Sequence, residues 1–505
     1  MINPRSSTVD AVLTRSAARH PDRVALRFAE RVWTYAELDA AVTRAAGVLL
    51  SFGLERGARV ATYGKNSDAY LLAYLGCARA GLVHVPINYA LTHGELAYLL
   101  EQSGSQLVLV DPALAARLPE TGLELEHVMA LRDEAGSLLE RAGSGDVPDL
   151  DVTVVDTDLV QLLYTSGTTS RPKGAMMTHR ALVHEYLSTI VALGCDASDE
   201  PLHPMPLYHS AGMHVFLMPY LAVGATNHLM EAPDIAEILR RVEGDAIGAL
   251  FLAPTVWVPL SQHPDLSTRD LGSLRKAFYG ASIMPQPVLQ RLQQRLPDLD
   301  FYNCFGQSEI GPLATVLGPA DHVERPESCG RSVLFVELRV VDGDGVDVAI
   351  GEPGEVIYRS PQLCEGYWEK PDETAEAFQD GWFHSGDLVR MDAEGFVTVV
   401  DRIKDVINTG GVLVASREVE DVLYTHPAVT EVAVIGTPDE RWIEAVTAFV
   451  VVKEPVAEAD LIAHAKQSLA GFKVPKHVYV VEELPRNASG KLLKRVLRDE
   501  IDTDA

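Results

Sequence analysis

The stretch QLLYTSGTTSRPKGAMMTH, residues 161–179, begins as an apolar run typical of a buried strand and continues as a loop rich in hydroxyl groups. Backbone amides freed by Gly167 and the hydroxyl donors can surround phosphate oxygens, while Lys173 and Arg171 supply positive charge. The hydroxyl donors are Thr165, Ser166, Thr168 and Thr169. The segment therefore predicts a strand followed by a polyphosphate-binding loop, with a plain polar surface turn as the alternative.

The order of residues in this loop excludes a Walker A motif. That motif places glycine directly before the lysine and a hydroxyl residue directly after it. Here Pro172 precedes Lys173 and Gly174 follows it. We therefore expect a phosphate-binding loop of another class.

Upstream of the loop, strand-like and helix-like segments alternate. Thr34 and Glu37 have the spacing of a capping box, which predicts a helix after Thr34 that ends near Gly53. The following segments are read as strands at 58–64, 82–88 and 106–111 and as helices at 68–79 and after Thr92. This alternation predicts an α/β architecture with a mainly parallel sheet.

Downstream, the pattern of predicted strands and helices changes twice. From about Glu337, short strand-like runs are separated by Gly, Pro and Asp, which indicates a β-rich subdomain. Beyond Asp401 a new alternation of helix and strand begins. We therefore expect a large domain over 1–403 and a small α+β domain over 404–505, which agrees with a chain too long for one hydrophobic core.

Composition narrows the classes of partner and the compartment. The net charge of −28 over 505 residues disfavours nucleic acid and anionic membrane surfaces. The cysteines form no CxxC pair, so we expect reduced thiols without a zinc site or a disulfide framework. No signal peptide or apolar run of membrane-spanning length is evident, and we expect a cytoplasmic protein.

The segment from Tyr164 to Gly174 resembles the phosphate loop of the adenylate-forming superfamily, which contains acyl-CoA synthetases, luciferases and adenylation domains of peptide synthetases. The resemblance covers almost the whole chain. It implies ATP and Mg²⁺ as cofactors, a large core and a small mobile domain that alternates between two positions. Ser170 stands where the family usually has glycine, which predicts a stiffer loop.

FGQSE, residues 305–309, resembles the family motif that contacts adenine, the α-phosphate and Mg²⁺. The resemblance assigns the adenine contact to the ring of Phe305, the α-phosphate contact to the hydroxyl of Ser308 and the metal contact to Glu309. These residue types suit the roles, because stacking needs a ring face and a hard cation prefers carboxylate oxygen. The resemblance also assigns Asn303 and Gly306 as contacts to the nucleotide.

Three later residues complete the resemblance. Asp387 in FHSGD resembles the aspartate that accepts hydrogen bonds from the ribose hydroxyls, and Arg402 resembles the arginine that contacts ribose and phosphate. Lys404 falls on the family's hinge. Lys491 resembles the lysine that bridges the substrate carboxylate and the α-phosphate, where its charge reduces the repulsion between two anions. Each residue alone could be a surface ion pair, and the joint order favours the functional interpretation.

The residues of the acyl pocket are assigned from the same resemblance. His209 in PLYHSAGM resembles the family's aromatic gate, and we favour a gate or pocket wall over a catalytic base. The resemblance assigns Gly212, Met213, Tyr279 and Gly280 to the substrate pocket, and it assigns Gly280, Ala281 and Ser282 to the nucleotide. Tyr279 narrows the pocket or packs in the core, and both alternatives stay open.

The acceptor of the acyl group is expected to be coenzyme A. INTGGVLVASREVE, residues 407–420, resembles the loop that lines the pantetheine tunnel, where Gly410 and Gly411 would admit a slim chain. The chain departs from the family at Ile443, where Trp-Gly-Glu is common.

The expected activity is that of a stand-alone acyl-CoA synthetase acting on a medium to large hydrophobic or aromatic acid. The alternatives left open are a ligase that loads a carrier protein, a luciferase-like oxygenase and a non-catalytic nucleotide sensor. A homodimer is also left open.

Overall fold

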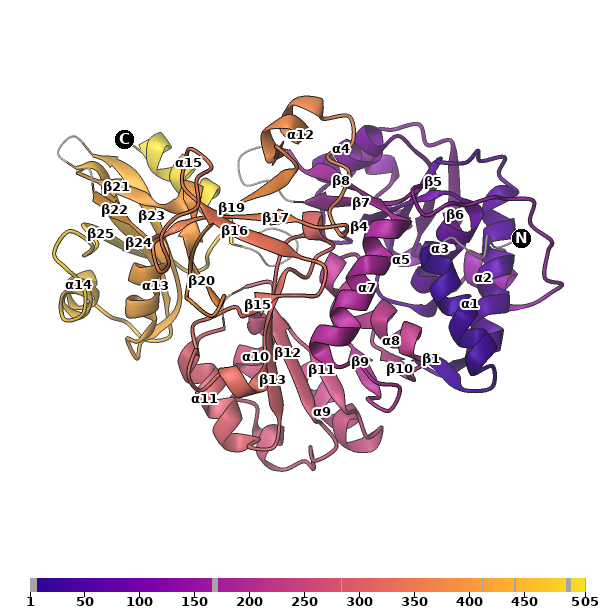
Figure 1. Cartoon of the computed structure of the whole chain (residues 1–505), viewed down its shortest axis with the longest axis horizontal. Coiled ribbons are helices and arrows are strands. Elements are labelled where there is room, and N and C mark those ends of the chain that lie inside the picture. Colours follow the sequence, from indigo (N-terminus) through magenta and orange to yellow (C-terminus); the bar gives the residue numbers. More distant parts are fainter. Residues whose placement is uncertain are drawn as a thin grey trace. The chain divides into compact units, whose positions relative to one another are not determined.

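The computed structural model describes residues 7–165, 171–282, 284–410, 412–439, 442–486 and 492–504 (Figure 1). By compactness the chain forms two units, and each is considered by itself. Unit 1 contains most of the chain up to Glu337 together with Tyr358–Phe383, while unit 2 contains Leu338–Ile357 and the region that begins at His384. The predicted boundary near Lys404 stays a prediction.

The phosphate segment belongs to a six-stranded sheet in unit 1. Its strands are parallel, except that the last pair forms an antiparallel hairpin. In spatial order they are β6 (His127–Ala130), β5 (Ser105–Val110), β3 (Arg59–Tyr63), β4 (Val83–Ile87), β7 (Leu159–Thr165) and β8 (Lys173–Thr178). The hairpin of β7 and β8 places the two ends of the phosphate segment opposite each other.

A second, nine-stranded sheet in unit 1 has a parallel centre and antiparallel pairs at both ends. In spatial order its strands are β15 (Arg331–Ser332), β14 (Thr315–Leu317), β13 (Asp300–Phe305), β12 (Lys276–Gly280), β11 (Ala249–Phe251), β9 (Pro201–His203), β10 (Asn227–Leu229), β1 (Val24–Phe28) and β2 (Arg31–Thr34). The parallel strands β12 and β13 end at Gly280 and Phe305, next to two of the predicted site segments.

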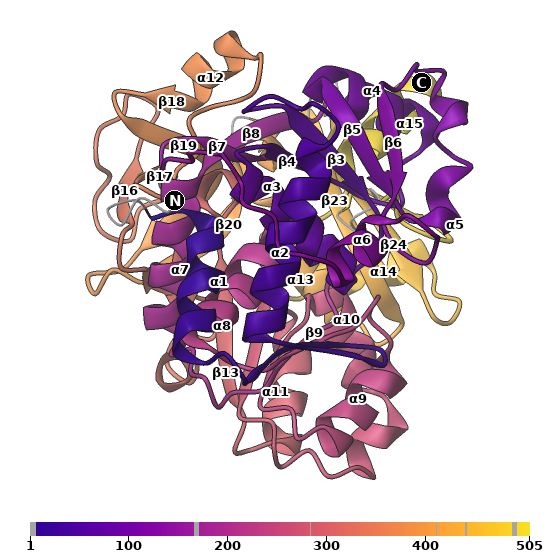
Figure 2. The same cartoon turned by 90° about the vertical axis from the view of Figure 1, so that its right-hand side faces the viewer.

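Helices cover these sheets. The helices of unit 1 are α1 (Val9–Arg19), α2 (Tyr35–Leu50), α3 (Asp68–Ala80), α4 (His93–Ser103), α5 (Pro112–Ala115), α6 (Leu138–Gly143), α7 (His179–Leu193), α8 (Met218–Val223), α9 (Ile235–Gly244), α10 (Pro254–Leu260), α11 (Gln286–Arg295) and α12 (Pro371–Ala377). Helices α1, α2 and α3 pack side by side (Figures 1 and 2). Thr34 caps α2 in the reciprocal arrangement with Glu37 that the sequence predicts. The apolar face of α2 and nearly all of α3 join one large core.

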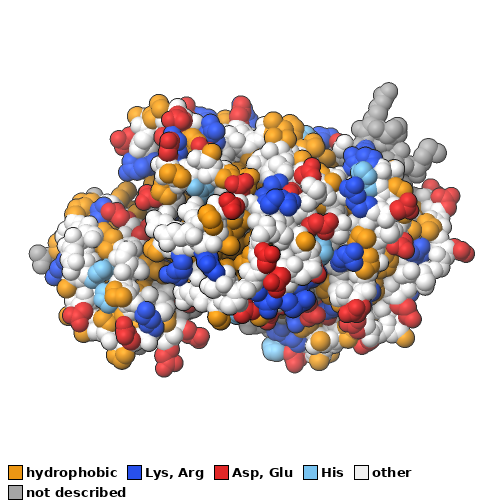
Figure 3. Space-filling view, turned by 90° about the horizontal axis from the view of Figure 1, so that it is seen from below, with side chains coloured by type: hydrophobic (Ala, Val, Ile, Leu, Met, Phe, Trp, Pro, Cys, Tyr) orange, Lys and Arg blue, Asp and Glu red, His pale blue; other side chains and the backbone are white. Residues whose placement is uncertain are grey.

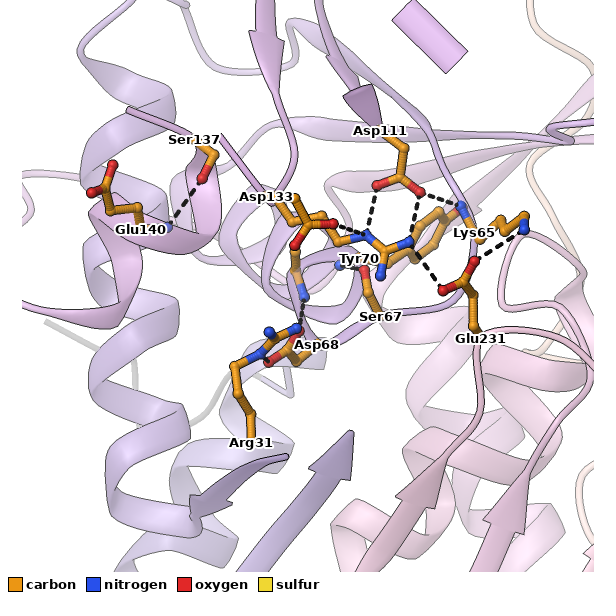
Figure 4. A network of polar contacts seen from close by, with 12 residues as sticks. Arg31, Lys65, Ser67, Asp68, Tyr70, Asp111, Asp133, Ser137, Glu140 and Glu231 are labelled. Carbon is orange, nitrogen blue, oxygen red and sulfur yellow. Dashed lines mark hydrogen bonds and ion pairs between the residues drawn. The ribbon is translucent and has the colours of Figure 1, made fainter. Parts of the chain in front are cut away.

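A polar network ties the two sheets of unit 1 together at the ends of their strands (Figure 4). The Asp111 carboxylate after β5 accepts from the Lys65 amide at 2.9 Å and pairs with Arg132 at the same distance. The Lys65 ammonium and Arg132 also reach Glu231, which follows β10 of the other sheet, at 3.0 and 3.6 Å. These contacts link the ends of β3 and β5 in one sheet to the end of β10 in the other.

The β-rich region and the carboxyl-terminal region form two smaller sheets. The first has the order β16 (Glu337–Val341), β17 (Gly354–Arg359), β19 (Trp382–Met391) and β18 (Phe378–Gln379), with β20 (Val397–Arg402) paired to β19. The second has the order β22 (Val412–Val414), β21 (Ile407–Thr409), β24 (Ile443–Val452) and β23 (Val429–Asp439), with β25 (His477–Val480) paired to β24. Helices α13 (Ser416–Tyr424), α14 (Glu458–Lys466) and α15 (Lys494–Asp504) accompany the second sheet.

The predicted α/β fold class is confirmed. No helix among the described residues is long and apolar enough to span a membrane. Side chains of both charges lie between hydrophobic ones on the face shown in Figure 3.

Ile443, one of the departures from the family pattern, has a strained backbone. It begins β24 with φ of 69° and is 60% exposed. A β-branched residue in the left-handed region is an outlier, because its Cβ crowds the following carbonyl oxygen.

We expect Ile443→Gly to raise the free energy of unfolding of this region by up to about 1 kcal/mol, since relief of strain exceeds the entropic cost of glycine. Ile443→Ala is the matched control, because it removes the exposed side chain and keeps a Cβ at positive φ. Scanning calorimetry of both variants checks the effect, and an equal shift of the melting temperature in the two would contradict it.

Candidate functional site

The two ends of the phosphate segment face each other across the β7–β8 hairpin. Thr165 is the last residue of β7 and is the register partner of Lys173, the first residue of β8. The Arg171 guanidinium lies 5.0 Å from the centre of the Tyr98 ring, and the Tyr98 hydroxyl donates to the Pro172 carbonyl at 3.0 Å. The predicted contacts at Ser166, Gly167, Thr168 and Thr169, and the departure at Ser170, lie outside the described residues.

Tyr367 connects the phosphate segment to the predicted metal ligand. The Lys173 ammonium lies 5.0 Å from the centre of the Tyr367 ring, a cation–π distance. The Tyr367 hydroxyl donates to Glu309 Oε1 at 3.0 Å. Burial raises the pKa of this hydroxyl, so it stays protonated as a donor at neutral pH. The structure thus brings Lys173 to the ring, and Glu309 to the hydroxyl, of one aromatic side chain.

The FGQSE segment leaves β13 through a short helical turn at Ser308–Ile310. Ser308 Oγ lies 2.9 Å from Ser210 Oγ, which joins this segment to the one that carries His209. A Cβ on Gly306 would collide with the Pro312 carbonyl, so the close approach of the two backbones requires glycine. On the strand before it, Asn303 donates to the Ser328 carbonyl at 3.1 Å.

A buried carboxyl group supports the residues that follow Glu309. Glu185 on α7 accepts from the Leu313 amide at 3.2 Å and from the Gln362 amide nitrogen at 2.5 Å. Gln362 also donates to the carbonyls of Ile310 and Leu313, each at 3.2 Å. Burial raises the pKa of Glu185 well above its usual range. This support was not predicted, because its members lie far apart in the sequence.

The segment predicted as the acyl gate leads into a π-helix. His209 is partly exposed and lies beside Tyr208, with 5.1 Å between the ring centres. The π-helix spans Ala211–Leu217 and contains Gly212 and the buried Met213. A Cβ on Gly212 would lie 2.5 Å from the Pro206 carbonyl oxygen, so glycine lets this turn pack closely. π-Helical turns are rare and are frequent at functional sites.

Tyr279 and Gly280 end β12 beside β13. Tyr279 is buried in a hydrophobic cluster, and its hydroxyl donates to His322 Nε2 at 3.0 Å, because the other imidazole nitrogen is occupied by the Gly318 carbonyl. A Cβ on Gly280 would collide with the Cys304 carbonyl. Ala281 has φ of 64°, and it and Ser282 are exposed. Their assignment to pocket and nucleotide stays a prediction.

In unit 2 the structure brings Asp387 and Arg402 together. They face each other on β19 and β20, with 2.5 Å between Arg402 Nε and Asp387 Oδ1. Asp387 is 2% exposed, whereas a good part of the Arg402 side chain is open to solvent. The arrangement orients a buried carboxylate with a charge-assisted hydrogen bond, as a ribose ligand would require.

The remaining predicted residues also belong to unit 2. Lys404 lies exposed in the single turn Ile403–Asp405. Gly410 has φ of 65°, and its amide donates to the Trp442 carbonyl at 2.5 Å. Gly411 and Lys491 lie outside the described residues.

The donor set fits Mg²⁺ held jointly with phosphates. Among the described residues, no group of three or more His, Cys, Asp and Glu side chains could hold a metal ion by itself. Mg²⁺ in nucleotide sites typically uses one or two carboxylates together with substrate phosphates. Glu309, beside the phosphate segment, is such a carboxylate.

In unit 1 the phosphate segment lies beside a carboxylate on a two-sheet α/β core, and in unit 2 a buried carboxylate pairs with an arginine. Both features are those expected of an adenylate-forming enzyme. Residues 13–368 match the family model described as AMP-binding enzyme, and residues 418–491 match that of the AMP-binding enzyme C-terminal domain. The chain belongs to the AMP-binding enzyme family, as the sequence motifs predict.

Individual relatives match over nearly the full length. The chain is 37% identical to a feruloyl-CoA synthase from Amycolatopsis sp, over 96% of this chain and 97% of the relative. It is 33% identical to a fatty acid–[acyl-carrier-protein] ligase from Streptomyces coeruleorubidus, over 98% and 97%. The crystal structure of ATP-bound MatB from Rhodopseudomonas palustris superposes with a TM-score of 0.89 at 30% identity, covering 98% of this chain and 99% of that one.

The hydrogen bond from Tyr367 to Glu309 can be tested separately from the contact of the Tyr367 ring with Lys173. Tyr367→Phe keeps the ring beside Lys173 and removes the hydrogen bond to the carboxylate. Because a hydrogen bond to a charged group contributes about 1.5 to 3 kcal/mol, we expect the KM for Mg·ATP to rise about tenfold or more. Steady-state kinetics with varied Mg·ATP measures it.

Tyr220→Phe is the matched control, since it removes another buried hydroxyl of unit 1 on α8. An unchanged KM in Tyr367→Phe would contradict the role given to this hydrogen bond.

Proposed function

We propose that this protein is an acyl-CoA synthetase. It joins a carboxylic acid to ATP to give acyl-AMP and pyrophosphate, and it then transfers the acyl group to coenzyme A, releasing AMP. The observation that carries the proposal is the contact chain from Lys173 through Tyr367 to Glu309. Family membership and full-length similarity to a feruloyl-CoA synthase support it.

The residues of unit 1 act on the phosphates. Lys173 supplies positive charge at the end of the phosphate segment, and Ser308 offers a hydroxyl for the α-phosphate. Glu309 would hold Mg²⁺, which neutralises phosphate charge when bound. The Tyr367 hydroxyl keeps the Glu309 carboxylate in one orientation, so less rearrangement is needed when ATP binds.

Unit 2 supplies the remaining groups. Asp387 accepts hydrogen bonds from the ribose hydroxyls, and Arg402 keeps that carboxylate oriented. Lys491 reduces the repulsion between the attacking carboxylate and the α-phosphate. We further propose that residues 404–505 move as a domain about Lys404, and that Gly410 and Gly411 then line the path of the pantetheine arm.

The chemistry explains the use of two half-reactions. A carboxylate resists nucleophiles, because its charge is delocalised and oxide is a poor leaving group. Attack of the carboxylate oxygen on the α-phosphorus forms an acyl–phosphate bond and expels pyrophosphate. Attack of the coenzyme A thiolate on the acyl carbon then forms a thioester and expels AMP.

The acid we propose is aromatic or hydrophobic. The predicted pocket segment contains Met213 in the π-helix and is preceded by Tyr208, whose ring centre lies 5.5 Å from that of Tyr89 after β4. Such a wall favours an apolar or aromatic acyl group. The aromatic acid in the name of the Amycolatopsis relative supports this class.

Loading of a carrier protein is the second candidate function, and the similarity to the Streptomyces carrier-protein ligase favours it specifically. A cytoplasmic location is proposed for either activity. All five cysteines are buried and none forms a disulfide, which agrees with a reducing compartment.

Release of AMP and pyrophosphate from a panel of carboxylic acids separates the candidates. We expect aromatic and long apolar acids to release pyrophosphate with ATP, and AMP release to rise strongly once coenzyme A is added. A synthetase is contradicted if coenzyme A leaves turnover unchanged while a phosphopantetheinylated carrier protein accelerates it. Absence of pyrophosphate release with every acid would contradict adenylation itself.

The role of Lys491 gives a sharper test. Loss of one group that stabilises transition-state charge typically slows an enzyme about 10²- to 10³-fold, and we expect Lys491→Ala to slow adenylation by that factor. The thioester half-reaction, started from isolated acyl-AMP, should change much less. Arg495→Ala, which removes an exposed positive charge four residues away, is the control. Equal slowing of both half-reactions would contradict the proposed role.

A further inference from the structure

Residues 362–368, which we call the connecting segment, join the two sheets of unit 1 next to the predicted metal ligand. The segment lies between β17 and α12. Its residues form hydrogen bonds with β8 of the six-stranded sheet, with the turn that follows β13 of the nine-stranded sheet, and with α7. The proposed mechanism uses only one of these residues, Tyr367, so the other contacts call for an explanation.

One side of the connecting segment pairs with β8, the strand that begins at Lys173. The two run antiparallel. The Trp368 amide donates to the Gly174 carbonyl at 2.8 Å. The Met176 amide donates to the Gly366 carbonyl at 2.9 Å. The backbone of the segment is therefore held to the strand that carries Lys173.

The other side of the connecting segment holds the turn that contains Glu309. The Cys364 amide donates to the Glu309 carbonyl at 2.9 Å. The Gln362 amide nitrogen lies 3.2 Å from the carbonyl oxygens of Ile310 and of Leu313. Carbonyl oxygens can only accept, so the nitrogen of the Gln362 amide must face them. The turn is thus held through its backbone, in addition to the hydrogen bond that the Glu309 side chain accepts.

Helix α7 fixes the Gln362 side chain from its other side. Ser188 Oγ donates to Gln362 Oε1 at 2.5 Å, and Glu185 Oε2 accepts from Gln362 Nε2 at 2.5 Å. All three residues are fully buried. Glu185 Oε1 also accepts from the Leu313 amide at 3.2 Å, so it holds the same turn directly. Burial raises the pKa of Glu185 well above its usual range, so the carboxyl is neutral at pH 7 and acts on the turn through hydrogen bonds.

We propose that Gln362 and Glu185 are positioning residues that fix the Glu309 carboxylate for a divalent cation held between it and the phosphates of ATP. Mg²⁺ demands nearly ideal octahedral geometry, whereas Ca²⁺ accepts flexible geometry. A carboxylate fixed in one place therefore favours Mg²⁺, and the network contributes selectivity as well as affinity. The inference rests on the proposed function for the identity of the nucleotide, but binding of nucleotide and metal tests it without an acyl substrate.

The first experiment measures the Kd of α,β-methylene-ATP by calorimetry, with Mg²⁺ and with a chelator. In the parent protein we expect the metal to tighten binding. Gln362→Met keeps the approximate volume of the side chain and removes its polar atoms. In this variant we expect the effect of the metal to fall about two- to tenfold, the usual loss for one hydrogen bond, and the Kd in the chelator to change little. An equal effect of the metal in parent and variant would overturn the proposal, as would no effect in the parent.

The second experiment repeats the measurement with Ca²⁺ in place of Mg²⁺. We expect the parent to bind the nucleotide more tightly with Mg²⁺ than with Ca²⁺. Gln362→Met and Glu185→Leu should bring the two Kd values closer together, because a less restrained carboxylate tolerates the larger ion. A network that only stabilises the fold would not alter this ratio in the molecules that remain folded. The parental ratio in both variants would overturn the proposal.

Asn227→Leu is the matched control for Gln362→Met. Asn227 is also buried, and its amide nitrogen also donates to two carbonyls, those of Ala25 at 3.1 Å and Ala225 at 3.0 Å. It belongs to β10, so its loss should lower the melting temperature and leave the ratio of the Mg²⁺ and Ca²⁺ constants unchanged. A change of this ratio equal to that in Gln362→Met would overturn the proposal.

A milder variant covers the case in which Gln362→Met does not fold. Ser188→Ala removes only the hydroxyl that faces Gln362 Oε1. It should change the ratio of the Mg²⁺ and Ca²⁺ constants in the same direction by a smaller factor. The parental ratio in Ser188→Ala would then overturn the proposal.

The proposed function and the positioning role fail differently. A parent protein that binds nucleotide with Mg²⁺, yet releases no pyrophosphate with any acid, contradicts the proposed function and leaves the binding experiments decisive for the network. An active parent whose variants keep the parental effect of the metal and the parental ratio contradicts the positioning role alone.

Discussion

A buried amide in the middle of a strand constrains the core of unit 1. Gln161 is flanked on β7 by Val160 and Leu162, and its amide is satisfied only because His84 and His214 approach it from two sides. A slip of β7 by one residue would turn every side chain to the opposite face and leave the amide without partners. The two contacts of this side chain therefore help to hold the register of β7 and of its hairpin with β8, which begins at Lys173.

The nine-stranded sheet must be held in position relative to the six-stranded sheet, because Ser308 and Glu309 follow its strand β13. Polar side chains that extend from one sheet and form hydrogen bonds with the other hold it there. Asn66, just after β3, donates to the carbonyls of Met205 and Met230 and accepts from the Leu207 amide. The segment that leads to His209 is therefore held by backbone hydrogen bonds to a buried side chain. Polar links are directional, so they fix the two sheets more specifically than apolar packing alone.

Local rules predicted much of the fold. The capping box at Thr34 and Glu37 is present, and the alternating segments formed a mainly parallel sheet. These features depend on neighbouring residues, so they can be recognised without tertiary information. The π-helix at Ala211–Leu217 could not be predicted, because its run is apolar except for His214 and has no period that separates it from an α-helix.

The site was predictable to the extent that its residues occur in motifs. Asp387 and Arg402 were both expected to contact the ribose, and the pairing of their strands brings the two side chains together. Tyr367 was missed, because its partner Glu309 is distant in the sequence and an aromatic residue after a turn carries no local signal. The same holds for Gln362 and Glu185, whose contacts exist only in the folded chain.

The acidity of the chain has to be reconciled with a polyanionic substrate. A net charge of −28 repels phosphates at long range, yet at physiological salt such fields are screened beyond about 8 Å. Within that distance the charges nearest to a phosphate determine whether it is attracted or repelled. Among the described residues Lys173 has no carboxylate partner and lies against the Tyr367 ring, so its charge stays available to a phosphate, whereas Arg402 is neutralised by Asp387. A compact triphosphate needs only such a local cation for a favourable contact. The positive charge at Lys173 therefore suits a small nucleotide in spite of the acidity of the chain as a whole.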